Sequence, residues 1–92
     1  MSKRTWSIEF DRQASRELDD LDGQVAKRIL KFLNQRLAQL EDPRTIRESL
    51  RGPIWGEYWK YRVGDYRIIA HIEDQLIRIL VVRIGNRKEV YR

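Results

Sequence analysis

The chain has 92 residues and no cysteine, and its 19 lysine and arginine residues exceed its 14 aspartate and glutamate residues to give a formal charge of +5. This length fits one small domain with one core, predicted to span residues 1–92. The lack of cysteine excludes disulfides and thiolate metal sites and fits a reducing cytoplasm, and no signal peptide or membrane-spanning run is recognisable. The positive charge favours a polyanion or an acidic protein as partner.

The N-terminal half predicts one strand followed by two helices. Residues 5–10 alternate between apolar and polar side chains, which is typical of a half-buried strand. Asp11 and Asp22 are typical N-cap residues for a short helix and for a longer helix that ends before Pro43. The longer helix carries an apolar stripe that indicates core packing, made of Val25, Ile29, Leu30, Leu33, Leu37 and Leu40.

Residues 44–54 are predicted to form a loop, because Gly52-Pro53 is a typical turn pair. Arginines in this segment could follow a phosphate backbone, although solvated charge is the commoner role of such residues. The arginines concerned are Arg44, Arg47 and Arg51.

Gly64-Asp65 predicts a two-residue turn between two strands, with glycine at the first central position. This turn fixes a register in which Arg62 lies opposite Arg67 and Lys60 lies opposite Ile69. One face of the hairpin is then the core face, with Trp59, Tyr61, Val63, Ile68, Ala70 and Ile72. The other face carries Tyr58, Lys60, Arg62, Arg67 and His71.

The predicted pairing of Arg62 with Arg67 puts like charges directly across a strand pair, which costs stability. Guanidinium groups match the oxygens of phosphate, so this face is a candidate anion site. A solvated basic surface on an ordinary hairpin explains the same residues equally well.

The C-terminal part predicts a further strand over residues 76–84, which are apolar apart from Arg78 and Arg83. Such a run suits a central strand covered by helices on one face. Glu73-Asp74 predicts the turn before it. The whole order predicts an α+β fold, β-α-α-β-β-β, with a helical hairpin on one face of a mainly antiparallel four-stranded sheet.

The side chains available for catalysis are mainly arginine, lysine and tyrosine. His71 is the only histidine, no residues have the spacing of metal ligands, and no phosphate-binding loop or serine nucleophile motif is present, so no cofactor is expected. Arginine, lysine and tyrosine have unperturbed pKa values of about 10 and above, so they stabilise charge better than they exchange protons at neutral pH. They suit metal-independent RNA cleavage, in which the ribose 2′-OH attacks the adjacent phosphate.

Several short stretches, in order and with their spacing, resemble the RelE/ParE superfamily of bacterial type II toxins over nearly the whole chain. The stretches are Leu50 to Gly52, Tyr58 to Arg62, Gly64 to Ile69 and Ile84 to Tyr91. In this superfamily the RelE branch cuts mRNA in the ribosomal A site, and the ParE branch poisons DNA gyrase. The resemblance is closer to the RelE branch, because ParE toxins generally lack the set Lys60, Arg67, Arg87 and Tyr91. A gyrase inhibitor and a plain RNA-binding domain stay as alternatives.

The resemblance implies a role for each member of this set. Lys60 would help to activate or charge-balance the 2′-OH, and Arg67 would stabilise the pentacovalent phosphate. Arg87 would neutralise or protonate the leaving 5′-oxygen, and Tyr91 would stack on a base. Tyr58 departs from the pattern, since well-known members carry a second lysine there that is a proposed base. Further RNA contacts are expected from Arg51, Arg62 and Lys88.

The resemblance also implies the partners. These are a cognate antitoxin protein, the ribosome and mRNA, with DNA reached only indirectly through the antitoxin complex and no membrane. The basic sheet face suggests that an acidic amphipathic helix of the antitoxin covers it. A cytoplasmic location is expected.

Overall fold

The computed structural model describes residues 5–46, 49–54 and 58–86, and the side chains of 49–54 are outside this description. Two helices, α1 (Arg12–Asp19) and α2 (Gly23–Lys31), follow the first strand. The five strands are β1 (Ser7–Phe10), β2 (Ser49–Ile54), β3 (Tyr58–Val63), β4 (Tyr66–Glu73) and β5 (Arg78–Asn86). Shorter helical turns are a π-helical turn at Phe32–Arg36 and 3₁₀ turns at Leu37–Gln39, Pro43–Thr45 and Asp74–Leu76.

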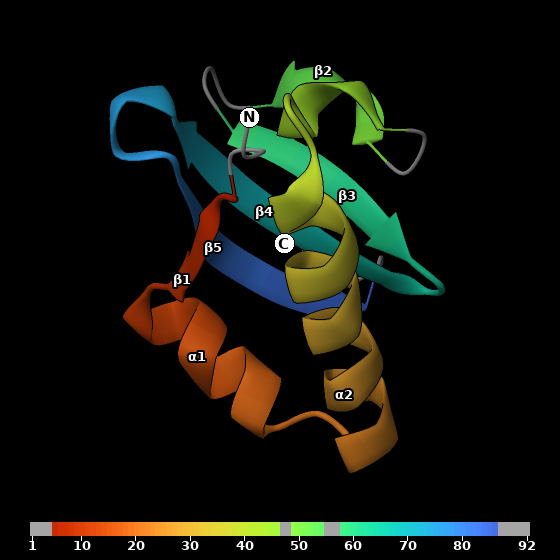
Figure 1. The fold of residues 1–92 in the computed structure, drawn as a ribbon. Coiled ribbons are helices and arrows are strands. Elements are labelled where there is room, and N and C mark those ends of the chain that lie inside the picture. Colours follow the sequence, from red (N-terminus) through yellow and green to blue (C-terminus); the bar gives the residue numbers. More distant parts are fainter. Residues whose placement is uncertain (1–4, 47–48, 55–57, 87–92) are drawn as a thin grey trace.

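The five strands form one sheet in the order β1-β5-β4-β3-β2, and both helices lie on one face of it (Figure 1). The predicted α+β fold, with a helical pair on one face of a mainly antiparallel sheet, is confirmed. Two details differ from the prediction. The pair β1–β5 is parallel, and the sheet has five strands because residues 49–54 add an edge strand.

The loop predicted over residues 44–54 is wrong for its second half, which forms β2. Ser49 pairs with Tyr61 and Ile54 pairs with Tyr58, with a register shift between Leu50 and Pro53. Glycine and proline are tolerated in an edge strand at such a bulge, because no neighbouring strand requires the proline N–H. The residues that indicated a turn therefore make a bulge.

The predicted helix boundaries are confirmed by their caps. The Asp11 carboxylate accepts a hydrogen bond from the Ala14 N–H at 2.9 Å, and that of Asp22 accepts one from the Gln24 N–H at 3.1 Å. The π-helical and 3₁₀ turns continue α2 and end before Pro43, as predicted. Each cap satisfies an amide that the first helical turn leaves without a partner.

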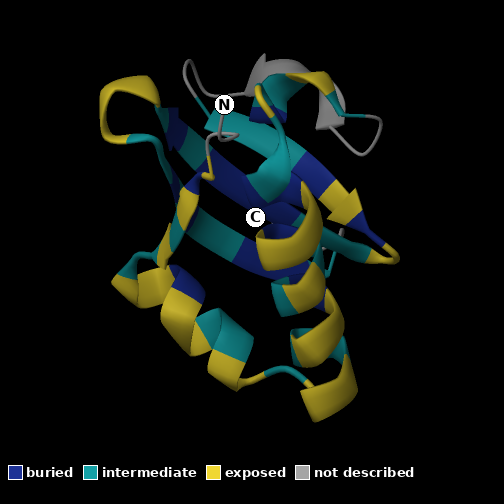
Figure 2. Ribbon diagram, viewed as in Figure 1, coloured by how far each residue is buried: buried dark blue, intermediate teal, exposed yellow. Residues whose placement is uncertain are grey.

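The core lies between the helices and the sheet, where the buried parts of both meet (Figure 2). From the predicted helical stripe, Ile29, Leu33 and Leu37 are fully buried. Tyr61 and Ile68 of the predicted core face are fully buried as well, whereas Trp59 is half-buried. In the described part of the chain, no helix has the length and apolar character needed to cross a membrane.

Candidate functional site

The β3–β4 hairpin has the predicted register. Lys60 pairs with Ile69, and Arg62 pairs with Arg67. Gly64 has a φ of +60°, a conformation that costs a residue with a side chain about 1–2 kcal/mol. Since alternate residues point to opposite faces and the neighbours Val63 and Ile68 are buried in the core, the two arginines lie on the face away from the helices.

Arg67 is held near the turn by its own backbone. Its Nη1 donates to the carbonyl oxygens of Gly64 at 3.5 Å and Tyr66 at 3.3 Å, and no carboxylate of the described residues pairs with it. Its partner on β5 is Gly85, so no β5 side chain lies directly opposite Arg67. The guanidinium therefore keeps its charge available for a ligand on this face.

The rest of this face is not uniformly basic. Ile69 is fully buried although it lies opposite Lys60. Tyr58 and His71 are cross-strand partners with ring centroids 5.6 Å apart and an interplanar angle of 52°. The face is thus basic near the turn and aromatic towards the other end of β3. The predicted register already contained the Tyr58–His71 pair, but no function was assigned to it.

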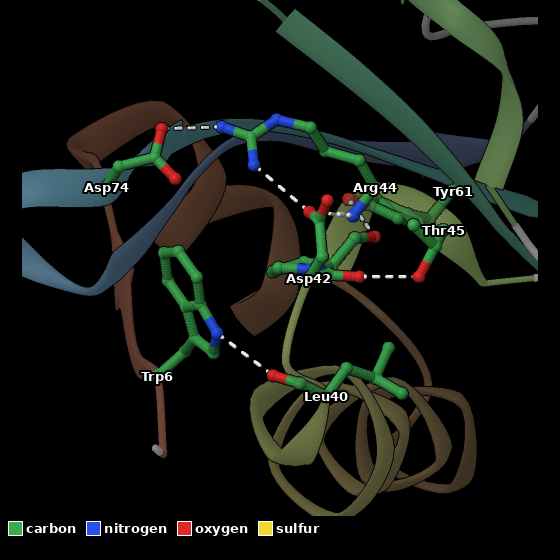
Figure 3. A network of polar contacts seen from close by, with 8 residues as sticks. Trp6, Leu40, Asp42, Arg44, Thr45, Tyr61 and Asp74 are labelled. Atoms are coloured by element: carbon green, nitrogen blue, oxygen red, sulfur yellow. Dashed lines mark hydrogen bonds and ion pairs between the residues drawn. The ribbon is translucent and has the colours of Figure 1, made fainter.

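Arg44 forms ion pairs with two carboxylates (Figure 3). It is one of the arginines for which contact with a phosphate backbone was considered. Its Nη1 lies 3.0 Å from Asp42 Oδ1, and its Nη2 lies 2.7 Å from Asp74 Oδ2. The hydrogen bond with Asp74, followed by that with Asp42, raises the pKa of Arg44 against the effect of burial. Arg44 is structural: it joins the segment after α2 to the β4–β5 turn.

The same network fixes the segment between α2 and β2 on the core. The Tyr61 hydroxyl donates to the Pro43 carbonyl at 2.8 Å, and Trp6 Nε1 donates to the Leu40 carbonyl at 3.0 Å (Figure 3). Burial raises the pKa of Tyr61, so its hydroxyl stays protonated and remains a donor. Tyr61 therefore anchors β3, the strand that carries Lys60 and Arg62.

Two arginines of β5 are also paired. Arg83 Nε lies 3.0 Å from Glu17 Oε2 on α1, and the other oxygen of Glu17 accepts the Ile84 N–H at 2.8 Å. Arg78 Nε lies 2.5 Å from Glu73 Oε1, and this hydrogen bond lowers the pKa of Glu73. Neither arginine is available for a polyanion without losing its carboxylate partner.

Of the predicted site residues, the structure places Lys60, Arg62 and Arg67 on one face within two rungs of the hairpin. Arg51 lies in β2 at the register shift, and its side chain is outside the description. The remaining three, Arg87, Lys88 and Tyr91, lie outside the described residues, so their roles stay predictions. Among the residues that are described, no group of three His, Cys, Asp or Glu side chains could hold a metal ion.

Comparison with known sequences identifies one family. The profile of the family described as ParE toxin of type II toxin-antitoxin system, parDE, matches residues 8–91. The mRNA interferase toxin RelE of Escherichia coli is 30% identical over 91% of this chain and 87% of its own length. Toxin RelG of Mycobacterium tuberculosis is 24% identical over 95% of this chain and 97% of its own length.

Comparison with solved structures finds the same fold. A chain of the toxin–antitoxin complex RelBE2 from Mycobacterium tuberculosis superposes with a TM-score of 0.77 at 20% identity, covering 96% of this chain and 98% of its own length. The isolated E. coli RelE toxin superposes with a TM-score of 0.69 at 28% identity, covering 94% of this chain and 90% of its own length.

Proposed function

Because this chain belongs to the ParE toxin family of type II toxin–antitoxin systems and is a RelE-like toxin, we propose that it is an endoribonuclease that cleaves mRNA in the ribosomal A site without a metal ion. One observation carries the proposal. Arg67 faces Arg62 across the hairpin on the face away from the helices, without a carboxylate partner among the described residues and with Gly85 as its neighbour on β5. A like-charged pair of this kind is relieved by a phosphate.

In the proposed reaction the 2′-oxygen bonds to the adjacent phosphorus while the bond from phosphorus to the 5′-oxygen breaks. The products are a 2′,3′-cyclic phosphate and a free 5′-hydroxyl, and the proton lost by the 2′-OH balances the one gained by the 5′-oxygen. Arg67 stabilises the charge that develops on the phosphate oxygens. Lys60 balances charge at the attacking oxygen, whereas Arg87 and Tyr91 act on the leaving group and the base.

These side chains include no acid–base group matched to neutral pH, and we expect the ribosome to compensate by aligning the RNA for cleavage. A matched acid–base group is worth about 10² to 10⁴ in rate, and Tyr58 stands where relatives carry a proposed base. Holding the 2′-OH in line with its phosphate supplies about 7–11 kcal/mol in favourable cases. The A site holds mRNA bent and single-stranded, so it can provide this alignment.

The test compares one labelled RNA, free and bound to ribosomes, at equal protein concentration. We expect cleavage within the A-site codon on the ribosome and negligible cleavage of the free RNA. Equal cutting of both would refute ribosome dependence. An Arg87→Ala variant that cuts at the wild-type rate would refute the role of Arg87 while leaving the proposal for the other residues open to its own tests.

The family match itself favours a second candidate, a toxin that inhibits DNA gyrase without cleaving RNA. The same preparation distinguishes the two functions. Inhibition of gyrase supercoiling with no cleavage in either RNA sample would replace the nuclease by the inhibitor.

We also propose a cognate antitoxin as partner, because several similar structures are toxin–antitoxin complexes. An acidic helix over Lys60, Arg62 and Arg67 would neutralise the like-charged pair. Calorimetry with the product of a neighbouring gene checks this: the affinity should fall as salt rises, and salt-independent binding would contradict an electrostatic contact.

A further inference from the structure

A pocket of about 570 Å³ lies between the end of α2 and the β3–β4 turn, outside the face on which cleavage is proposed. Ligand sites in proteins typically have volumes of about 300–1,000 Å³, so this one has room for a group the size of a nucleotide. Its charged lining residues are all basic: Arg28, Lys31 and Arg36 from the helical segment and Arg62 from β3. No carboxylate is among its described lining residues.

One of these cations, the Arg28 guanidinium, lies close to Gly64 of the β3–β4 turn. A Cβ at position 64 would lie 3.0 Å from Arg28 Nη1 and 3.3 Å from its Cζ, so the guanidinium lies directly against Gly64. Arg28 and Arg62, which is two residues before Gly64 in the chain, line the same pocket. In the described part of the chain, Arg28, Lys31 and Arg62 make no hydrogen bond or ion pair through their side chains.

Arg28, Lys31 and Arg62 are gathered without a carboxylate partner among the described residues, and such a cluster raises the free energy of the folded chain. Bound phosphates relieve this repulsion. Arginine suits this better than lysine, because its planar fork matches two phosphate oxygens at once. Phe32 also lines the pocket and offers an apolar surface beside the cations.

Arg62 joins the pocket to the proposed cleavage face. It lines the pocket and is also the cross-strand partner of Arg67. A strand of nucleic acid that presents a phosphate to Arg67 can therefore continue around the end of the hairpin and reach Arg28 and Lys31. A regular series of phosphates fits this arrangement better than an acidic peptide, whose carboxylates have no fixed spacing.

We propose that this basic pocket binds backbone phosphates of the RNA strand next to the segment held on the sheet face, a second contact that rests on the proposed function. The proposal predicts that binding affinity depends on the length of the RNA. A trinucleotide is held by the sheet face alone, whereas a longer single strand also engages the pocket.

The test uses full-length protein and single-stranded RNA with 2′-O-methyl riboses, which cannot be cleaved, so that binding is measured separately from catalysis. The variant is Arg28→Gln/Lys31→Gln. The matched control is Arg16→Gln/Lys27→Gln, which removes the same charge from exposed helical positions outside the pocket lining. All four positions are exposed, so neither variant should lose thermal stability.

Fluorescence anisotropy across a salt titration should show about tenfold weaker binding of the long RNA by the pocket variant. The slope of log affinity against log salt should fall in magnitude by about 1.4, since each phosphate contact to a single strand contributes about 0.7. Trinucleotide binding should be unaffected, and the control variant should keep the wild-type slope.

An equal loss of RNA affinity in both variants would overturn the proposed pocket contact and would indicate binding by diffuse surface charge. No RNA binding by the wild-type protein would overturn it too, as would unchanged RNA binding together with weakened antitoxin binding, which would make the pocket a protein-docking site. If pocket-dependent binding is found but ribosome-bound RNA is not cut, the nuclease proposal fails and the pocket stands.

Discussion

Two regions of this molecule use arginine in opposite ways. Around the β4–β5 turn and along β5, Arg44, Arg78 and Arg83 each have a carboxylate partner. Around the β3–β4 turn, Arg28 and Arg62 have none among the described residues. The sequence distributes basic residues along nearly the whole chain, whereas the fold separates those that are neutralised from those that remain available to an anion.

This difference matters for function more than for stability. Exposed ion pairs contribute only about 0–1 kcal/mol each to stability, so the pairing of Arg44 or Arg78 stabilises the fold modestly. Pairing does, however, remove a cation from competition for phosphate. An arginine is thus a better candidate for RNA contact when its nearest described oxygen atoms are carbonyls, as for Arg67, than when they are carboxylates.

The largest expected effect tests this comparison directly. Arg67→Ala should slow the cleavage step on programmed ribosomes about 10²-fold, by analogy with removal of one donor from an oxyanion hole, without a loss of stability. Arg44→Ala is the matched control, because it removes one arginine that is already neutralised. Single-turnover kinetics measures both. If the two variants lose activity equally, carboxylate pairing does not distinguish functional from structural arginines.

Around the β4–β5 turn and along β5, where the arginines have carboxylate partners, the largest expected effect of a substitution is a loss of stability. Glu17→Ala leaves the Ile84 N–H and the Arg83 guanidinium without their acceptor, and its side chain is only 18% exposed. We expect the free energy of unfolding to fall by about 2 kcal/mol, typical of a lost hydrogen bond to a charged group. Glu17→Gln keeps an oxygen acceptor and should lose less. Urea denaturation measures both variants, and equal losses would contradict the role of the amide contact.

The hairpin was predictable from sequence because its determinants are local. Gly64 fixes the turn, the turn fixes the register, and alternation then assigns the faces. The fifth strand of the sheet was not predictable from sequence, because the bulge of β2 depends on pairing with β3 rather than on Gly52-Pro53 alone. The ion pairs were not predictable either. Arg83 and Glu17 are 66 positions apart, and no local rule joins them.

The candidate site divides in the same way. Register alone brought Arg62 and Arg67 together, so the sheet-face part of the site followed from sequence. The basic pocket did not follow from sequence, because the N-cap, the apolar stripe and Pro43 predicted the helix that carries Arg28 and Lys31 but not its approach to the turn. Their approach to the turn depends on how α2 packs on the sheet, which is a tertiary feature.

A smaller effect is expected from a substitution in the β3–β4 turn, next to which Arg28 and Arg62 have no carboxylate partner among the described residues. Gly64→Ala should lower the free energy of unfolding by about 1–2 kcal/mol, because φ is +60°, a conformation that residues with a side chain rarely adopt. Gly23→Ala is the control, since a Cβ there meets nothing within 4 Å and alanine is the better helix former. It should leave stability unchanged or raise it slightly. Equal melting temperatures for the two variants would remove the strain argument.

The smallest expected effect is a pH dependence confined to the paired region. The hydrogen bond from Arg78 lowers the pKa of Glu73 below its ordinary value of 4.5. A carboxylate with a depressed pKa in the folded state contributes stability above its unfolded pKa and loses that contribution as the pH falls through its folded pKa. Glu73→Gln, which cannot titrate, should therefore be less stable than wild type at neutral pH and equally stable in acid.

Thermal unfolding from neutral pH to below the folded pKa of Glu73 measures this difference, which should be small because the pair is partly exposed to solvent. Arg28→Gln provides the comparison from the other region. Its guanidinium has no carboxylate partner among the described residues, so its stability curve should run parallel to that of wild type. Parallel curves for Glu73→Gln as well would mean that the Glu73–Arg78 pair does not persist in solution. The two regions would then differ in geometry but not in the electrostatic free energy of their arginines.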